Sequence, residues 1–339
     1  MGQPQALRRQ NRQQIVELLL MHGTLTRPQL AERSGLSKVT VNAIVQELLE
    51  HGVVTLLGGP SQGSGRVPQC VSLHPHLGGV MGVDVQRDSL LYQRQDLNGK
   101  RARNGKLRGQ PDLNAQLRQF MQDNAEDMTT VVMGVPAPVD SAGRLAEPNA
   151  LPELDPARLQ DTLQNQRVQV TFENDANLAA LAAAQRLPEF GHLAVLLERE
   201  SGTGLGLILH GELYRGALGR AGELGRTPWP HGNGSEALEQ LPEKQRIEAT
   251  AFTLAGLTQT LDLQHVVIGA CPRVGNDMAR RTAELLPAGI SVSVEGACAE
   301  LVRDGASILA LNLGREALLQ RLTHLTGGEM GVRGEGHVA

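Results

Sequence analysis

The stretch VQVTFENDANLAALAAAQRL, residues 168–187, joins a strand pattern directly to an alanine-rich helix pattern. Two other strand patterns, GVMGVDV (79–85) and TVVMGVPAPV (130–139), are separated by the helix pattern NAQLRQFMQDNAEDM (114–128). Strands that alternate with helices are typical of α/β architecture. We therefore predict an α/β body for most of the chain.

Asp175 lies at the junction of this strand and helix, between the amides Asn174 and Asn177. Three roles fit it: a catalytic base, a group in a ligand pocket, and a helix cap. The spacing alone favours the cap, because Asp and Asn at a helix start accept backbone N–H groups that would otherwise lack partners. Whether Asp175 is also a catalytic base or a ligand-binding group depends on the motifs in the rest of the chain.

Length and composition limit the class of protein. At 339 residues the chain exceeds the usual single domain of about 100–200 residues, so two or three domains are expected. No uncharged apolar run of about 18 residues is present to span a membrane. The opening MGQPQALRRQNRQQ lacks the apolar core of a signal peptide, so we expect a cytoplasmic protein without a membrane partner. The cysteines form no C-x-x-C pair and are expected to be buried apolar fillers: Cys70, Cys271 and Cys298.

Charge is distributed unevenly along the chain. The net charge is −4, yet residues 1–70 hold seven cations and four anions, a balance of +3, which leaves −7 for the remainder. A basic N-terminal segment attached to an acidic body is typical of a nucleic-acid-binding module in front of a separate module.

Three helix patterns occupy this basic segment. NRQQIVELLLMHG (11–23) has apolar residues at helical spacing, and in TLTRPQLAERSG (24–35) Thr26 and Gln29 form a capping box before a closing glycine. SKVTVNAIVQELLEHG (37–52) carries an apolar stripe opposite a polar face: Val41, Ile44, Val45 and Leu48. This order predicts a helix-turn-helix whose last helix enters the major groove of DNA by its N-terminal half.

The polar face of the third helix carries side chains suited to reading bases. Lys38 can donate to guanine, Asn42 can pair with adenine, and Val39 can contact a thymine methyl group. The next segment, VVTLLGGPSQGSGRVPQCVSLHP (53–75), has two apolar runs around a Gly/Ser/Pro tip and predicts a β-hairpin wing, whose arginine suits phosphate or minor-groove contact. The predicted DNA-contacting residues are Ser37, Lys38, Val39, Thr40, Asn42, Gln46 and Arg66.

Several of these segments resemble the ROK family of repressors and sugar kinases. GLSKVTVNAIVQELLEHGVV and GSGRVPQCVSLHP are similar to its recognition helix and wing. Four motifs of the body follow in the order typical of the family: GVPAPVDSAGRLAEPN, FENDANLAA, GTGLGLILHGELYRGALGRAGELGR and VVIGACPRVG. Together they cover most of residues 10–315.

The resemblance implies a winged helix-turn-helix at residues 1–75 followed by a two-lobed actin/hexokinase-like (ribonuclease H-like) α/β domain. Its small lobe would span 76–190, and its large lobe, with a C-terminal helix, would span 191–339. Sugar would bind between the lobes. In the family's kinases the residue that matches Asp175 is the catalytic base, while those that match Asn174 and Glu223 hydrogen-bond the sugar. We expect these three to bind an effector, because carboxylates and amides suit hydroxyls that both donate and accept.

The chain departs from the family at the first phosphate loop, D-x-G-x-T, where it has Asp84, Val85, Gln86, Arg87 and Asp88. Gln86 places a side chain where the turn requires none, and Asp88 places a negative charge where ATP phosphates would lie. Phosphoryl transfer depends on positioning and charge neutralisation. We therefore expect no kinase activity, no catalytic residue and no cofactor.

The family's zinc-binding cysteine cluster is missing as well. TPWPHGNGSEALEQL (227–241) contains no cysteine, and His231 alone cannot replace a tetrahedral site, so no metal is expected. Glu236 or Glu239 would stand in for the glutamate that follows the cluster, and the sequence does not choose between them. Residues 241–249 are short for the family, so a trimmed large lobe is expected.

Together these features predict a DNA-binding transcriptional regulator, a repressor of sugar-related genes, with a degenerate sugar-kinase-like effector domain. Its partners would be a pseudo-palindromic operator, bound by a homodimer or a dimer of dimers, and a sugar or sugar-phosphate effector. One alternative is an active ATP-dependent sugar kinase, which Asp175 and the glycines at 202–206 favour. Another is a DNA-binding protein whose ROK domain is only a dimerisation scaffold, which the zinc loss and the trimmed lobe favour.

Overall fold

The computed structural model describes residues 3–58, 69–100, 102–124, 126–147, 149–162 and 168–323. The chain divides into two compact units. Unit one comprises residues 1–80, 95–102 and 311–339, and unit two comprises residues 81–94 and 103–310.

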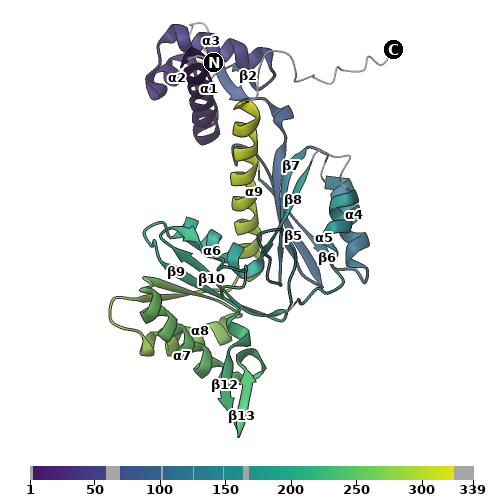
Figure 1. Ribbon diagram of the computed structural model, residues 1–339, viewed down its shortest axis with the longest axis vertical. Helices are drawn as coiled ribbons and strands as arrows, with labels where there is room; N and C mark the ends of the chain where they lie inside the picture. Colours follow the sequence, from purple (N-terminus) through teal and green to yellow (C-terminus); the bar gives the residue numbers. More distant parts are fainter. Residues whose placement is uncertain are drawn as a thin grey trace. The chain divides into compact units, whose positions relative to one another are not determined.

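The N-terminal part of unit one is a winged helix-turn-helix (Figure 1). Its helices are α1 (Gln3–His22), α2 (Arg27–Ser34) and α3 (Lys38–Glu50). A three-stranded sheet in the order β1-β3-β2 completes it, with β1 (Leu25–Thr26), β2 (Val54–Gly58) and β3 (Gln69–Leu73). The strands β2 and β3 pair antiparallel and form the predicted wing. Arg66 lies outside the described residues.

Local sequence signals account for the helix ends and core of this module. The Thr26 hydroxyl accepts the Gln29 backbone N–H at 3.4 Å, and the Gln29 side chain accepts the Thr26 N–H at 2.9 Å, which is the predicted capping box. Gly35 ends α2 in the left-handed conformation with φ 70°. The predicted apolar stripe of α3 is buried throughout: Val41, Ile44, Val45 and Leu48.

Unit one also contains the hairpin tip at residues 95–102 and the end of α9 (Cys298–Thr323). Arg315 on α9 donates to the Leu97 carbonyl at 2.9 Å and to the Leu20 carbonyl at 3.1 Å. One guanidinium thus joins the hairpin tip and α9 to the C-terminal turn of α1.

Unit two is built on two five-stranded sheets with the same strand order. The first runs β6-β5-β4-β7-β8 and the second β11-β10-β9-β14-β15. The strands of the first sheet are β4 (Gly79–Val85), β5 (Ser89–Asp96), β6 (Arg103–Arg108), β7 (Met128–Val135) and β8 (Gln169–Asn174). Those of the second sheet are β9 (Leu193–Arg199), β10 (Gly202–Leu209), β11 (Glu212–Leu213), β14 (His265–Gly269) and β15 (Ser291–Glu295). This repeated order agrees with the predicted two-lobed architecture.

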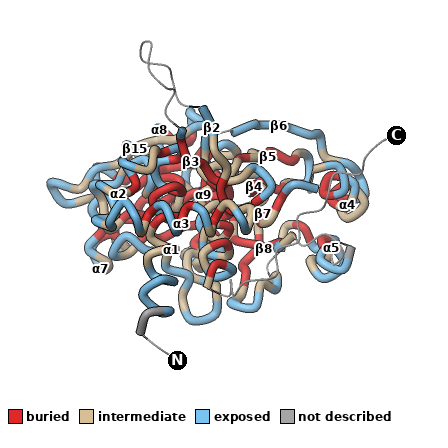
Figure 2. Tube along the Cα trace, turned by 90° about the horizontal axis from the view of Figure 1, so that it is seen from above, coloured by how far each residue is buried: buried red, intermediate tan, exposed pale blue. Residues whose placement is uncertain are grey.

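Each sheet has its own hydrophobic core. The strands β4 and β7 are buried along almost their whole length, as the red segments of Figure 2 show. The helix α4 (Leu113–Asn124) packs on the first sheet through Leu117, Phe120 and Met121. The second sheet is covered by α7 (Glu243–Leu261) and α8 (Pro272–Leu285). Unit two also contains the helices α5 (Pro156–Thr162) and α6 (Asp175–Arg186) and the first part of α9.

Two of the three glycines of β10 are explained by close packing against α6. A Cβ atom on Gly206 would lie 2.1 Å from the Ala176 carbonyl oxygen, and one on Gly204 would lie 3.0 Å from the Ala176 Cβ. At these two positions the backbone of β10 therefore approaches a helix of the same chain closely.

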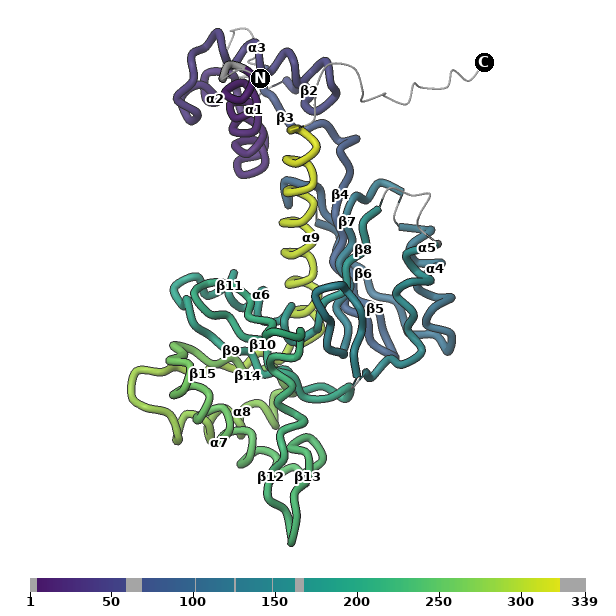
Figure 3. The backbone as a smooth tube through the Cα atoms, viewed as in Figure 1, coloured from purple at the N-terminus to yellow at the C-terminus, as the bar shows by residue number. Residues whose placement is uncertain are grey.

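A short hairpin occupies residues 228–237, in the segment whose sequence contains no cysteine cluster. It consists of β12 (Pro228–His231) and β13 (Gly234–Ala237), which pair antiparallel (Figure 3). The helix α7 begins soon after this hairpin and the short η3 (Leu238–Gln240). Among the described residues, no group of three or more His, Cys, Asp or Glu side chains could hold a metal ion, and no helix is long and apolar enough to cross a membrane.

The prediction that the cysteines are buried fillers is wrong in part. Cys70 is buried in β3, but Cys298 is only partly buried and Cys271 is exposed. Cys271 is the residue just before α8, and Pro272 takes the first helical position.

Candidate functional site

A cavity of about 410 Å³ lies in unit two and collects the three predicted effector residues. Asn174, Asp175 and Glu223 all line it. The other polar side chains of its lining are Glu147, Asn149, Ser201, Thr203, Arg226 and Glu239. The end of β8, the start of α6 and the turn between β9 and β10 all contribute to the cavity.

Asn174, rather than Asp175, caps α6. Its side-chain oxygen accepts the Asn177 backbone N–H at 3.1 Å, and its amide donates to the Ala137 carbonyl at 3.2 Å. The helix begins at Asp175, whose carboxylate accepts the Ala176 N–H at 2.9 Å. The spacing correctly predicted a cap here, but assigned it to the wrong residue.

The Asp175 carboxylate faces Arg199, a residue that no pattern in the sequence singled out. Arg199 ends β9 and donates to both oxygens of Asp84, at 2.6 and 2.9 Å. The same guanidinium lies 3.4 Å from Asp175. Asp84 and Asp175 are 1% and 6% exposed, so one guanidinium holds two buried carboxylates.

This arrangement places two carboxylates and one guanidinium together in a buried position, which shifts the pKa values of Asp175 and Arg199. Burial raises the pKa of Asp175 to about 6 from its ordinary 3.8, the Arg199 charge lowers it, and the Asp84 charge raises it. Burial opposes the charged form of Arg199, but hydrogen bonds and charge from Asp84 outweigh it and raise the pKa of Arg199.

Glu223 and Glu239 place two more carboxylates at the cavity. Glu223 precedes the short helix η2 (Leu224–Arg226) and makes no capping bond, and burial raises its pKa. Glu239 accepts the Thr203 backbone N–H at 3.3 Å and pairs with Arg226 at 3.2 Å. Glu236 lies exposed on β13 and does not line the cavity. The structure thus distinguishes the two glutamates between which the sequence did not choose.

The turn after β4 is filled by its own side chains. The Gln86 amide donates to Asp84 at 3.2 Å, while Arg87 donates to the Ala150 carbonyl at 3.0 Å and pairs with Glu153 at 3.2 Å. A phosphate cradle requires backbone N–H groups open to the ligand. In this turn the Gln86 backbone N–H is already bonded to the Ser89 carbonyl at 2.9 Å.

Glu173 is a second buried carboxylate beside the cavity, and it has a full set of partners. It accepts from Arg215 at 2.7 Å, from the Asn177 amide at 2.9 Å and from the Asn174 backbone N–H at 2.9 Å. Satisfaction of this kind is typical of a structural group, because buried carboxylates are stable only when hydrogen-bonded.

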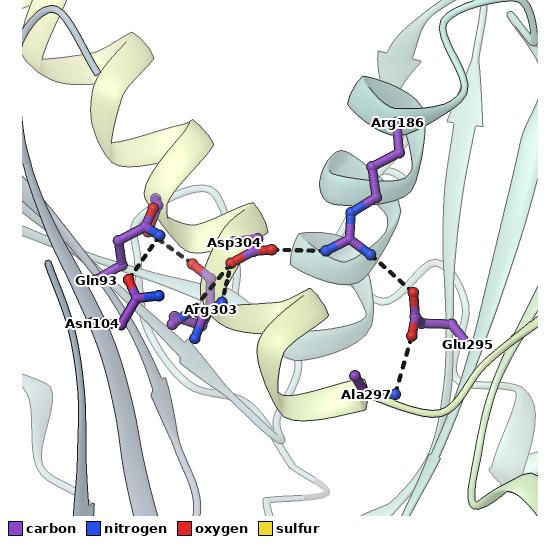
Figure 4. Close-up of polar contacts among 8 residues, drawn as sticks. Gln93, Asn104, Arg186, Glu295, Ala297, Arg303 and Asp304 are labelled. Carbon is purple, nitrogen blue, oxygen red and sulfur yellow. Dashed lines mark hydrogen bonds and ion pairs between the residues drawn. The ribbon is translucent and has the colours of Figure 1, made fainter. Parts of the chain in front are cut away.

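An ion network fixes the far end of α6 (Figure 4). Arg186 donates to Asp304 at 2.7 Å and to Glu295 at 2.9 Å, and Glu295 accepts the Ala297 N–H at 3.1 Å. Arg303 also donates to Asp304, at 2.6 Å. The helix that presents Asp175 at one end is thereby tied at its other end to β15 and to the first turns of α9.

Four of the predicted DNA-contacting side chains lie on one face of α3: Lys38, Val39, Asn42 and Gln46. Lys38, Asn42 and Gln46 are exposed, and Val39 is 79% exposed. An exposed apolar side chain at the start of a recognition helix suits contact with a base methyl group. Gln46 donates to Glu50 at 3.0 Å, a bond it would have to exchange to reach a base.

Two of the predicted contacts also have a structural role at the start of α3. The Ser37 hydroxyl accepts the Thr40 N–H at 3.1 Å, and the two hydroxyls lie 2.8 Å apart. Ser37 is thus the N-cap residue of α3.

Comparison with known families gives a match in each part of the chain. Residues 111–275 match the model of the ROK family, and residues 8–55 match that of winged helix-turn-helix DNA-binding domains. The xylose repressor of Caldicellulosiruptor bescii is 25% identical over 243 residues, which cover 67% of this chain and 60% of the repressor. The chain therefore spans less than two thirds of the length of this curated relative.

Solved structures show the same fold. A ROK family transcriptional regulator, a homologue of the E. coli MLC protein, has a TM-score of 0.61 at 15% identity and covers 91% of this chain and 99% of its own. A ROK family glucokinase from Streptomyces griseus, in complex with glucose and AMPPNP, has a TM-score of 0.57 at 17% identity. The match covers 69% of this chain and 100% of the glucokinase. These likenesses confirm the predicted architecture.

Proposed function

The chain joins a winged helix-turn-helix to a ROK family domain, and from this pairing we propose that it is a transcriptional repressor of sugar-related genes. The helix α3 reads an operator, and a sugar bound in the cavity of unit two releases the protein from DNA. The observation that carries the proposal is the cavity, which gathers Asn174, Asp175, Glu223 and Glu239 in the same chain as the exposed face of α3. The similarity to the xylose repressor of C. bescii supports it.

The proposed repressor has no kinase activity. Its fold is shared with a glucokinase, but Gln86 fills the turn after β4 and Arg199 faces the Asp175 carboxylate. A general base has to be free to take a proton, and phosphoryl transfer needs its phosphates held by positive groups. In this chain the carboxylate serves as a hydrogen-bond acceptor for the ligand.

The charges of the cavity favour an uncharged sugar over a sugar phosphate. Four carboxylates and one guanidinium belong to its lining: Glu147, Asp175, Glu223, Glu239 and Arg226. A phosphate brings nearly two negative charges and is repelled where like charges already dominate. Hydroxyl groups can donate to these carboxylates and accept from Asn149 and Thr203, so the lining suits a polyol.

The operator is a pseudo-palindrome bound by a homodimer or a dimer of dimers, because paired half-sites mirror a two-fold axis. A sugar can release DNA only if it binds more tightly to the DNA-free state than to the DNA-bound state. Action on chromosomal DNA places the protein in the cytoplasm.

The test combines DNA and sugar binding on the full chain. An operator is first selected from genomic fragments, and fluorescence anisotropy then measures its affinity with pentoses, hexoses and their phosphates. One uncharged sugar should weaken operator binding by about 5- to 150-fold and raise the melting temperature, whereas its phosphate should do neither. The matched control Asn42→Ala should lose operator affinity and keep the thermal response to sugar.

Each failure of this test has a distinct meaning. If operator binding is specific but no sugar changes either readout, the ROK domain is a dimerisation scaffold. ATP turnover stimulated by a hexose would establish the kinase alternative.

A further inference from the structure

Three segments of unit two meet at the guanidinium of Arg199. Asp84 ends β4 in the first sheet, Asp175 begins α6, and Arg199 ends β9 in the second sheet. Arg199 spans both oxygens of Asp84 in a forked pair and reaches Asp175 with one of the same nitrogens. The side chain of Arg199 is 11% exposed, so all three charges are largely removed from water.

We propose that Arg199 is a specificity-determining residue that supplies the cation of this site from the chain itself and so excludes a divalent metal ion and any nucleotide that the metal would carry. The inference goes beyond the proposed repressor function, because it concerns which ions the site accepts and does not depend on DNA release.

The chemistry of the pair explains the exclusion. Carboxylate oxygens are the preferred ligands of hard divalent cations, so two buried carboxylates that face one point would attract such an ion. The planar guanidinium occupies that point with two nearly parallel N–H bonds to Asp84, and it stays charged at every pH at which proteins fold. A metal ion would have to displace the Arg199 guanidinium. Because this group is part of the chain, it is present at the site at every metal concentration.

The neighbouring side chains reinforce this assignment. The Gln86 amide donates to Asp84 at 3.2 Å, so one Asp84 oxygen accepts from Gln86 as well as from Arg199. Without Arg199, two buried carboxylates would face each other with only neutral donors, and one divalent ion would balance both charges. A purely structural ion pair makes a different prediction, since its removal should lower stability without creating a metal site.

The experiment measures binding of Mn²⁺ alone to the full chain, by electron paramagnetic resonance of the free ion, with circular dichroism to confirm folding. Wild type should show no specific Mn²⁺ site. Arg199→Met, which keeps the apolar stem and removes the charge, should bind one Mn²⁺ per chain at least tenfold more tightly than wild type. The double variant Arg199→Met/Asp84→Asn should lose that site.

The matched control is Arg215→Met, which frees the single buried carboxylate Glu173 from a comparable ion pair at 2.7 Å. It should behave like wild type, because one carboxylate does not make a pair. A specific Mn²⁺ site in wild type would overturn the proposal, as would equal binding by Arg199→Met and Arg215→Met.

A further variant keeps the test decisive if Arg199→Met does not fold. Arg199→Gln removes the positive charge but keeps an amide that can donate to Asp84. It should therefore fold and bind Mn²⁺ at least tenfold more tightly than wild type. Binding equal to that of wild type would show that the charge of Arg199 does not exclude the metal.

Discussion

Replacing Asp175 by Asn should stabilise the protein at neutral pH, although it removes a buried ion-pair partner. Asp84, Asp175 and Arg199 together carry one excess negative charge, and the variant leaves a neutral Asp84–Arg199 pair with its forked bonds of 2.6 and 2.9 Å intact. The rise in the pKa of Asp175 from 3.8 to about 6 corresponds to about 3 kcal/mol, at about 1.36 kcal/mol per pKa unit. The lost contact to Arg199 is long, at 3.4 Å, so we expect a net gain of about 1–3 kcal/mol.

The sign of this effect depends on pH. Folded wild type holds the Asp175 proton more tightly than the unfolded chain, so its free energy of unfolding falls as pH rises from 3.8 to about 6 and is level above that. Below 3.8 the carboxyl group is neutral in both states and resembles an amide. The advantage of the variant should therefore be small at low pH, grow through this window and stay constant above it.

Urea unfolding of both proteins across this pH range measures the difference directly. Asp84→Asn is the matched control, because the same isosteric change there breaks the forked pair and should destabilise by about 3–5 kcal/mol. A variant less stable than wild type at neutral pH would refute the reasoning. A difference in the free energy of unfolding that does not change with pH would also refute the reasoning. It would show that ionisation of Asp175 does not lower the stability of wild type.

Other substitutions test the remaining parts of the interpretation. Asn42→Ala should cost about 1–3 kcal/mol on the cognate operator and relax base preference at one position, which a binding titration against single-base operator variants would show. Ser37→Ala should lower the free energy of unfolding by about 0.5–2 kcal/mol in denaturant titrations, because it removes the cap bond of 3.1 Å. Gly206→Ala should lower the melting temperature markedly, since its Cβ atom would lie 2.1 Å from the Ala176 carbonyl oxygen. Glu239→Gln should weaken the thermal response to sugar but leave operator affinity unchanged, and a loss of both would place Glu239 in the fold instead.

Features with a local cause could be predicted from the sequence. The capping box of Thr26 and Gln29 depends on residues three positions apart, and the buried stripe of α3 follows helical periodicity. The order of strand and helix patterns likewise indicated the α/β body, because each pattern is complete within one segment. In all these cases the interacting groups are neighbours in the chain.

The arrangement around Asp84 could not be predicted in this way, because its partner is 115 residues distant. The sequence singled out the turn at Asp84 for its missing glycine, yet nothing at Arg199 indicated an ion pair. Only the meeting of β4 and β9 brings the two together. For the same reason the sequence could not choose between Glu236 and Glu239. Which of them lines the cavity depends on where the hairpin β12–β13 ends, and composition does not show this.

The contrast between Glu173 and Asp175, two buried carboxylates near the cavity, supports the proposal that Asp175 is the one that binds the ligand. Glu173 has three donors from Arg215, Asn177 and the Asn174 backbone, so its place in the fold accounts for all of its contacts. Asp175 has one backbone N–H and one long contact to a guanidinium that is mainly engaged elsewhere. A carboxylate can accept about four hydrogen bonds, so Asp175 keeps capacity on the side that lines the cavity. A buried carboxylate that lacks some of its hydrogen-bond donors lowers the stability of the folded protein. Hydroxyl groups of a ligand would donate to it, so this stability would be regained only when the ligand is bound.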